Sequence, residues 1–517
     1  MKRRKFLKNV GLTTAGLPLV IDNMKYEAIQ KKLFNFSKSA EDRVLVIIRL
    51  NGGNDGLNTI IPLDQYDNLM IQRPNILIPE NQLLDLNVSN LALHPVMTGM
   101  KNLFQEGQLG VIQNVGYPDQ NRSHFRSMDI WSRGALDHFE TRGWLGRHMD
   151  DYYPNYPEDY PNENYPDPFA ISMGYNVSET CQGLMANFSQ AIANPFDSVT
   201  LPGSTVVDDG TYYGSHVAYL SNLIEQTNAY GGRISAAANA GNSLSSKYDM
   251  NSQLAVQLKY VAQMISGGLE TKVYVLNLDG FDTHNAQVTA GNVTLGRHAN
   301  LLKDLSDAIE AFQDDINLLG INHRVAGFTF SEFGRQIASN ASEGSDHGDA
   351  APMFLFGECI SAQVIGTNPE ISNTVVNQAG IPMEIDFRDV YASLLKDWFL
   401  VPEEDISPLF ENEVNYIDLL GSCNLNITQE TKNKESLFLY PNPATDRTTL
   451  RFEAKGSSYT LQISDMMGNI VKNVFTNHQL AGTQEVPIDL HDFKAGFYNV
   501  MLNDRTSAKS IRLVVVK

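Results

Sequence analysis

Five short segments of this chain are built mainly from apolar residues, and they restrict its possible folds more than any other feature. They cover residues 44–50, 109–115, 273–278, 325–330 and 353–356. Runs without regular apolar and polar alternation are typical of strands buried on both faces, as in a parallel sheet covered by helices. Apolar stripes at helical spacing lie between these runs, at residues 254–265 and 301–319. The alternation predicts an α/β fold with a mostly parallel sheet and helices on both faces.

Size and charge exclude several classes of protein. The 517 residues exceed what one core usually needs, so we expect more than one folded unit. The net charge of −20 and the pI near 4.9 oppose binding to nucleic acid or to anionic lipid. No apolar run after the N-terminus is long enough to span a membrane, so the mature chain is predicted to be water-soluble. Its three cysteines (Cys181, Cys359 and Cys423) allow one bridge, which the sequence does not assign.

The N-terminal 30 residues have the pattern of an export signal. Residues 2–5 read Lys-Arg-Arg-Lys, and Phe6-Leu7-Lys8 and a weakly apolar stretch to Ile21 follow. Adjacent arginines before such a stretch resemble a twin-arginine signal, which exports proteins that have already folded. The alternative is an amphipathic N-terminal helix.

The last part of the chain changes in texture near Lys434. Short alternating strands follow at residues 450–452, 459–463, 496–500 and 510–516, which predicts a small all-β sandwich. The sequence motifs at residues 439–446, 465–468 and 494–498 resemble the type A sorting domain of Bacteroidetes type IX secretion. The N-terminal signal implies the twin-arginine machinery as a partner, and the sorting-domain resemblance implies the type IX secretion machinery and a place at the outer-membrane surface or outside the cell. We expect a signal segment at 1–30, an α/β core at 43–423, a linker at 424–435 and the sorting sandwich at 436–517.

Polar clusters stand at the ends of the predicted strands. They occupy residues 51–59, 279–284 and 331–335, and two more lie at 121–125 and 344–349. In open α/β sheets ligands bind beyond the carboxyl ends of the strands, so we expect these clusters to face one site. Taken singly, their residues suit helix caps or loop hydrogen bonds. Taken together, their carboxylates and imidazoles suit zinc, manganese, magnesium or calcium: Asp55, Asp282, His284, Glu332 and His347.

The order of these motifs resembles a known family. The matching motifs are residues 50–59, 122–125, 143–147, 279–284, 331–335, 346–348 and 386–388. Trp131, between the second and third of these motifs, also matches. As a set they resemble the domain-of-unknown-function family 1501 (DUF1501), over roughly residues 43–399. That family is usually placed in the alkaline phosphatase superfamily, alongside sulfatases and phosphomutases.

The resemblance implies roles for individual residues. Ser123 takes the position of the nucleophile, with His124 and Arg122 as further catalytic candidates, and Arg122 or Arg126 supplies positive charge to an oxyanion. The implied metal ligands are Asp55, Asp282, His284, Glu332 and His347, with Asp279 as the alternative carboxylate. Two departures matter, because Phe333 stands where a histidine is usual and Asp282 is only two residues from His284. One metal ion, two ions and a relic site therefore all stay open.

These observations favour an exported metal-dependent hydrolase of phosphate or sulfate esters, acting on a small-molecule or glycan ester. Either Ser123 or a metal-bound water would attack. The alternative is a non-catalytic cell-surface protein that keeps the fold for binding or assembly. An esterase is suggested by Gly53-Asn54-Asp55, but the Gly-Asp-Ser block such enzymes need upstream is missing. The tyrosine-, proline- and acid-rich residues 150–168 are predicted to form a surface loop stiffened by prolines.

Overall fold

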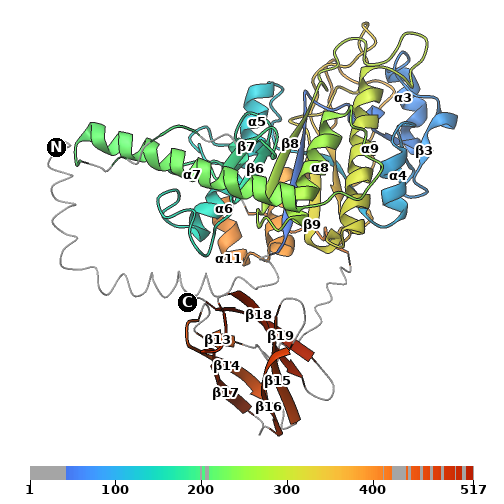
Figure 1. Ribbon diagram of the computed structural model, residues 1–517. Helices are drawn as coiled ribbons and strands as arrows, with labels where there is room; N and C mark the ends of the chain where they lie inside the picture. Colours follow the sequence, from blue (N-terminus) through green and yellow to red (C-terminus); the bar gives the residue numbers. More distant parts are fainter. Residues whose placement is uncertain are drawn as a thin grey trace. The chain divides into compact units, whose positions relative to one another are not determined.

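The computed structural model shows two compact units, Met1–Cys423 and Asn424–Lys517, each of which is described by itself (Figure 1). In the first unit it describes residues 42–197, 201–203, 206, 209–410 and 413–421. In the second it describes residues 438–515 except 441–443, 455–457, 466–469, 479–481, 495 and 504–507. The expected signal segment at 1–30 and linker at 424–435 lie outside the described residues, so both remain predictions.

The first unit is built on one mixed sheet. Its strand order is β11 (Val364–Ile365), β5 (Leu109–Gly116), β10 (Ala351–Phe356), β9 (Val325–Phe330), β1 (Val44–Asn51), β8 (Val273–Asp279), β6 (Ala170–Met173) and β7 (Ser189–Ile192), with β12 (Ile385–Asp386) paired to β5. All five predicted strands are present. The pairs of β1 with β8 and β9, and of β6 with β7 and β8, are parallel.

Strand β10 runs against its neighbours, since it pairs antiparallel with both β5 and β9. Leu355 lies opposite Phe328, and Phe356 lies opposite Gly327. The beginning of β10 is therefore at the same edge of the sheet as the carboxyl ends of β1, β8 and β9. Residues just before β10 consequently meet residues that follow the other strands.

Helices cover both faces of the sheet, as predicted. On β1, Val44, Val46 and Ile48 belong to one buried cluster, and Leu45 and Ile47 belong to another. This alternation follows from the two-residue period of a strand. The first cluster includes α4 (Thr98–Gln105), the end of α7 (Tyr212–Ala240), α8 (Gln253–Ser266) and α9 (Arg297–Leu318). The second includes α5 (His124–Arg133), α6 (Trp144–Tyr152) and α10 (Phe387–Ser393). The prediction of an α/β fold is confirmed.

Smaller elements complete the first unit. A second sheet joins β2 (Ile60–Pro62), β4 (Leu91–Leu93) and β3 (Leu84–Asp85), and α3 (Tyr66–Gln72) follows β2 in the chain. The short helix α11 (Glu403–Ile406) comes after α10. The first half of α7 extends away from the sheet in Figure 1, and Tyr212 and Tyr213 at its start are exposed.

The segment 150–168 differs from the predicted surface loop. Tyr156 is 6% exposed, and its ring stacks on Phe188 with 4.2 Å between centroids. Tyr153 stacks on Phe169 at 3.8 Å, and Tyr160 and Tyr165 also contact Phe169. Large aromatic rings gain free energy when they are buried, so the tyrosines form part of the core.

The second unit is all-β. One sheet has the order β13 (Phe438–Tyr440), β14 (Arg447–Ala454) and β17 (Gly482–Asp489). The other has the order β16 (Ile470–His478), β15 (Ser458–Asp465), β18 (Gly496–Asn503) and β19 (Ala508–Val515). All the pairs within these two sheets are antiparallel. Buried residues such as Leu450, Leu461 and Leu513 give this unit its own core, which confirms the predicted β character.

Two further expectations concern the cysteines and the membrane. Cys181 is free and buried, whereas Cys359 is disulfide-bonded. Among the described residues, no helix combines the length and the apolar character needed to cross a membrane.

Candidate metal centre

Four side chains from three segments of the chain meet at the edge of the sheet where β1, β8 and β9 end. Asp282 and His284 follow β8, and His347 precedes the antiparallel strand β10. His124 is the first residue of α5. We call these four residues the His/Asp cluster. Of the residues expected at one site, the structure brings Asp282, His284 and His347 together.

The ligand-type atoms of this cluster lie close together. Asp282 Oδ1 is 3.1 Å from Nε2 of His284 and 3.2 Å from Nε2 of His347. The two Nε2 atoms of His284 and His347 are themselves 2.9 Å apart. Nε2 of His124 lies 3.6 Å from the other carboxylate oxygen, Oδ2 of Asp282.

Each histidine of the cluster also makes a hydrogen bond through its second ring nitrogen. Nδ1 of His284 lies 2.7 Å from Oδ1 of Asp346, and Nδ1 of His347 lies 2.9 Å from the carbonyl oxygen of Arg122. Nδ1 of His124 lies 2.8 Å from Oε1 of Glu332. Carboxylate and carbonyl oxygens accept hydrogen bonds, so the proton of each ring is on Nδ1.

The surroundings shift the pKa of several of these groups. Partial burial acts to raise the pKa of Asp282, but the hydrogen bond and the positive charge of Arg335 outweigh it and lower the pKa to about 2. The hydrogen bond to Glu332 raises the pKa of His124 above its ordinary value. Burial lowers the pKa of His347. Asp282 is therefore an anion throughout the neutral range.

Arg335 makes hydrogen bonds to several of the backbone segments around the cluster. Its side chain is fully buried, and its guanidinium donates to Oδ1 of Asp282 at 2.8 Å. It also donates to backbone carbonyls of the neighbouring turns: Gly52, Gly53, Phe281 and Ser345. Gly52 has φ of +123°, and a Cβ there would lie 2.2 Å from the backbone nitrogen of Asp282. The turn after β1 thus needs glycine to approach the turn after β8.

Asp55, expected as a metal ligand, is not part of the cluster. Its carboxylate is 1% exposed, and Oδ2 accepts from Nη1 of Arg73 at 2.7 Å and from Nε2 of Gln287 at 2.5 Å. Burial acts to raise the pKa of Asp55, but the charge and hydrogen bond of Arg73 outweigh it, and the pKa is lowered. The buried arginine occupies the place at the carboxylate that a cation would take.

The carboxylates of two other expected ligands, Glu332 and Asp279, accept hydrogen bonds from neighbouring residues. Glu332 is 2% exposed, and Oε1 accepts from the backbone N–H of Gly52 at 2.9 Å as well as contacting His124. It therefore orients His124 and lies behind the cluster. Asp279 is exposed, and its Oδ1 accepts from Nδ2 of Asn51 at 2.7 Å.

The three expected catalytic residues are adjacent in the chain and lie at the start of α5. Ser123 is exposed and is the N-cap residue of this helix, but its side chain makes no capping bond. Arg122 makes a two-pronged ion pair with Asp349, with Nε–Oδ1 at 2.8 Å and Nη2–Oδ2 at 2.7 Å. His124, predicted as a catalytic residue, points instead toward Asp282 with its free nitrogen.

Sequence reasoning did not single out Asp346 or the carbonyl of Arg122 as partners of the cluster. The sequence did contain a signal for Asp346, because it is a carboxylate directly before His347, one of the expected metal ligands. The backbone carbonyl had no signal in the sequence, because any residue type supplies one.

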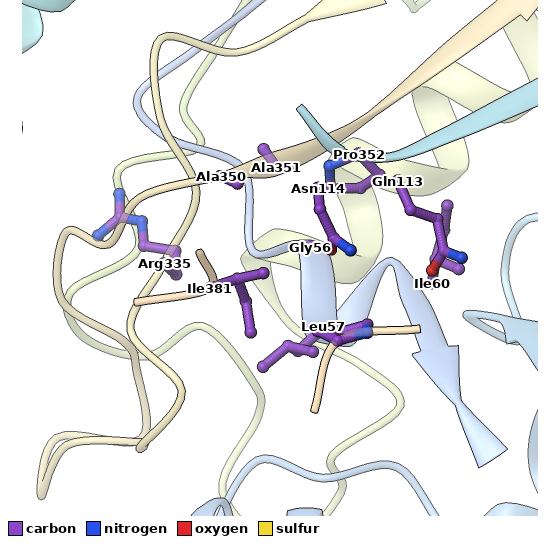
Figure 2. A pocket seen from close by; sticks show the side chains of 11 residues that line it. Gly56, Leu57, Ile60, Gln113, Asn114, Arg335, Ala350, Ala351, Pro352 and Ile381 are labelled. Carbon is purple, nitrogen blue, oxygen red and sulfur yellow. The ribbon is translucent and has the colours of Figure 1, made fainter. Parts of the chain in front are cut away.

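Two pockets lie near the cluster. An open pocket of about 560 Å³ is lined by His124 and Glu332, together with Arg49 and Asn51 from β1. A second pocket of about 20 Å³ has Arg335, Gln113 and Ile381 in its walls (Figure 2). That volume has room for about one water molecule, so only the first pocket is large enough for part of a substrate.

The geometry defines an α/β protein with a histidine and aspartate cluster at its strand ends, followed by an all-β unit. Residues 255–409 match the sequence model of a protein family of unknown function, DUF1501. This range contains Asp282, His284 and His347, but it leaves out His124. Residues 438–517 match the model of the secretion system C-terminal sorting domain. These matches confirm the resemblance to DUF1501 over residues 255–409 and the resemblance to a sorting domain, whereas the twin-arginine signal remains a prediction. No curated protein matches the chain.

Several solved structures align with the chain at low similarity. PorZ, a surface component of the type IX secretion system of Porphyromonas gingivalis, aligns over 16% of this chain and 12% of its own, with 20% identity and a TM-score of 0.13. A protein of the alkaline phosphatase superfamily from Vibrio parahaemolyticus aligns over 92% of this chain and 83% of its own, with 9% identity and a TM-score of 0.34. A phosphonate monoester hydrolase from Silicibacter pomeroyi aligns over 91% of this chain and 89% of its own, with 9% identity and a TM-score of 0.29. At these TM-scores we take neither fold nor chemistry from the three structures.

Proposed function

We propose that this chain is an exported metal-dependent hydrolase of phosphate or sulfate esters. Its centre is one divalent metal ion held by His124, Asp282, His284 and His347. The proposal is supported above all by the hydrogen-bonding state of the histidines.

Lone pairs converge in the His/Asp cluster. Because His284 and His347 both hold their protons on Nδ1, both Nε2 atoms carry lone pairs in the neutral rings. These two acceptors lie 2.9 Å apart and face Oδ1 of Asp282, which is a third acceptor. Acceptors at such distances repel one another unless a cation lies among them. A metal ion is a cation that all of these atoms can bind at once.

The spacing of the donor atoms also suits a metal ion. A tetrahedral site with bonds of about 2.0–2.2 Å has its ligand atoms about 3.4 Å apart. The separations of 2.9, 3.1, 3.2 and 3.6 Å in the cluster lie around that value. His124, Asp282 and His347 also form a group whose ligand atoms all lie within 4.8 Å of one another.

The donor set favours some metals over others. Three imidazoles and one carboxylate suit zinc and comparable transition metals, whereas magnesium and calcium prefer oxygen ligands. The acceptors at Nδ1 orient the rings and make them better ligands, which is the usual arrangement around metal-bound histidine. When bound, such a metal supplies a Lewis acid and lowers the pKa of a coordinated hydroxyl or water.

Residues beside the cluster are suited to an anionic ester. Ser123 and the first turn of α5 adjoin His124, and the N–H groups at a helix start attract anions. The Ser123 hydroxyl is not used in capping, which leaves it available as a nucleophile. Arg335 holds Asp282 in place from the buried side, so the carboxylate keeps its position during a reaction.

The sorting unit supports export. A match to the secretion system C-terminal sorting domain covers residues 438–517, and we take the secretion machinery as the partner of this unit. The hydrolase would then act at the cell surface or outside the cell.

Metal analysis of the purified full chain tests the proposal. The chain is stripped with a chelator, reloaded with zinc or manganese, and assayed on phosphate monoesters, phosphate diesters and sulfate esters. We expect about one equivalent of metal and hydrolysis of at least one ester that disappears with the chelator. A chain that binds no metal and hydrolyses nothing would be the non-catalytic binding protein of the alternative hypothesis.

A further inference from the structure

The open pocket of about 560 Å³ lies beside the His/Asp cluster and meets it at His124. His124 belongs to the cluster and also lines the pocket, whereas Asp282, His284 and His347 do not line the pocket. A group bound in the pocket is therefore next to an ester at the cluster, and is not the reacting group itself.

Arg49 enters this pocket because of the strand period. Leu45 and Ile47 point to one face of β1 and are buried in its core cluster, and Arg49 is the next residue with the same direction. Arg49 is the third residue from the end of β1, so its side chain reaches beyond the core into the pocket.

The guanidinium of Arg49 has unused hydrogen-bonding capacity. Its Nε is buried and has no hydrogen-bond partner. Glu179 and Glu332 interact with it electrostatically, but within the described part of the chain no carboxylate comes within ion-pair distance. Glu332 already accepts from Gly52 and contacts His124. The positive charge of Arg49 therefore has no close anionic partner among the described residues, and an oxyanion bound in the pocket that Arg49 lines would supply one.

The other walls provide contacts for an organic group. Phe125, which follows His124 on α5, is 89% exposed, and Val177, which also lines the pocket, is 50% exposed. Asn51 supplies an amide to the same pocket. An exposed aromatic ring beside polar side chains is typical of a binding surface.

We propose that this pocket binds the alcohol portion of the ester, that this portion carries an oxyanion of its own, and that Arg49 binds that oxyanion. The inference rests on the proposed hydrolase for the identity of the ligand as a substrate. Arginine presents a planar fork of donors that matches the oxygens of sulfonate, sulfate, phosphate or carboxylate. Arg49 is thus a specificity-determining residue.

A binding measurement tests the site without any turnover. Benzenesulfonate offers an oxyanion and an apolar ring, and calorimetry measures its affinity for the chelator-treated full chain. The wild-type chain should bind it, and Arg49→Gln should bind it about tenfold or more weakly. The control is Arg324→Gln, at the opposite end of the sheet, where Nε donates to the carbonyl of Asp42 at 3.0 Å. This control should bind as the wild type does, with melting curves verifying that both variants are folded.

A second measurement uses the metal-loaded chain and two esters, phenyl phosphate and 4-carboxyphenyl phosphate. Arg49→Gln should raise KM for the carboxylated ester about tenfold more than it raises KM for phenyl phosphate. Equal benzenesulfonate affinity in the wild type and Arg49→Gln, or no binding by the wild type, would overturn the inference. If the chain holds no metal and hydrolyses neither ester, the proposed function fails, and the benzenesulfonate measurement still decides the role of Arg49.

Discussion

At His347, the carbonyl of Arg122 fixes the ring proton on Nδ1 and leaves Nε2 facing Asp282 and His284. Replacing the ring removes one of four proposed ligands, so His347→Ala should weaken zinc binding by on the order of a hundredfold or more and abolish ester hydrolysis. Zinc content after competition with a chelator measures the first effect. His323→Ala, in the turn before β9, is the matched control and should keep its zinc. Wild-type zinc affinity in His347→Ala would remove this residue from the centre.

Ser123 separates two ways of attacking the ester. Because it adjoins His124 without being one of the four proposed ligands, Ser123→Ala should retain the metal. If its hydroxyl is the nucleophile, hydrolysis should fall by on the order of a hundredfold or more. Metal content and kcat/KM measured on the same sample give both answers. An unchanged kcat/KM would show that Ser123 only begins α5, and that water attacks.

Part of this site could be predicted from residue types alone. Asp282, His284 and His347 were expected together because polar motifs gather at strand ends. The expected grouping of Asp55 with them depends on side-chain direction, which the sequence does not give. Its carboxylate turns to Arg73, and nothing near Asp55 in the sequence signals a buried arginine 18 positions later.

At the scale of elements, the direction of β10 decides how the centre is assembled. The apolar run at 353–356 predicts a buried strand, and β10 is one, but its antiparallel pairing with β5 and β9 comes from tertiary contacts. This reversal brings His347, which precedes a strand, to residues that follow strands. The fold class was therefore predictable from buried runs, while the strand direction was not.

Helix α6 packs so closely on residues 182–183 that its one glycine, Gly146, has no room for a side chain. A Cβ on Gly146 would lie 1.9 Å from the carbonyl oxygen of Gln182. Gly146→Ala should therefore destabilise the first unit by about 1–3 kcal/mol or more. Gly232 in α7 has open space around it, so Gly232→Ala should instead stabilise by about 0.5–1 kcal/mol. Chemical denaturation of both variants measures the difference, and equal stabilities would contradict the packing of α6.

The ion pair between Asp55 and Arg73 joins the turn after β1 to the end of α3. Both side chains are buried, at 1% and 0% exposure. Asp55→Asn leaves the arginine charge buried without its partner, so it should destabilise the unit by about 3–5 kcal/mol at neutral pH. Thermal unfolding measures the stability of this variant. The control is Asp64→Asn, which changes an exposed aspartate in the turn before α3.

The same pair predicts a pH dependence. The pKa of Asp55 is lowered in the folded chain, so its contribution to stability is fully present above the unfolded pKa of about 3.9. This contribution is lost as the pH falls through the lower folded value. The stability difference between the wild type and Asp55→Asn should therefore shrink below about pH 4. A difference that stays constant down to pH 2 would show that the pair is not ionised as described.

At the scale of the whole molecule, the chain divides into two units with separate cores. The first contains the His/Asp cluster, and the second is an antiparallel unit of the sorting-domain type. The type of the second unit was predictable because its sequence motifs are short and recognisable. The packing of residues 150–168 was not, because the tyrosines there follow no helical or strand period.

Removal of residues 424–517 tests whether the two units fold and act independently. Since the core clusters of the first unit contain only residues up to Leu420, the truncated chain should keep the melting temperature of the core, its metal and its ester hydrolysis. In a cell with the matching secretion system, the full chain should reach the surface or the medium, and the truncated chain should stay inside the outer membrane. Fractionation followed by an activity assay in each fraction measures both effects. A truncated chain that still reaches the surface would mean that another segment directs export, and one that melts earlier would mean that the last unit stabilises the first.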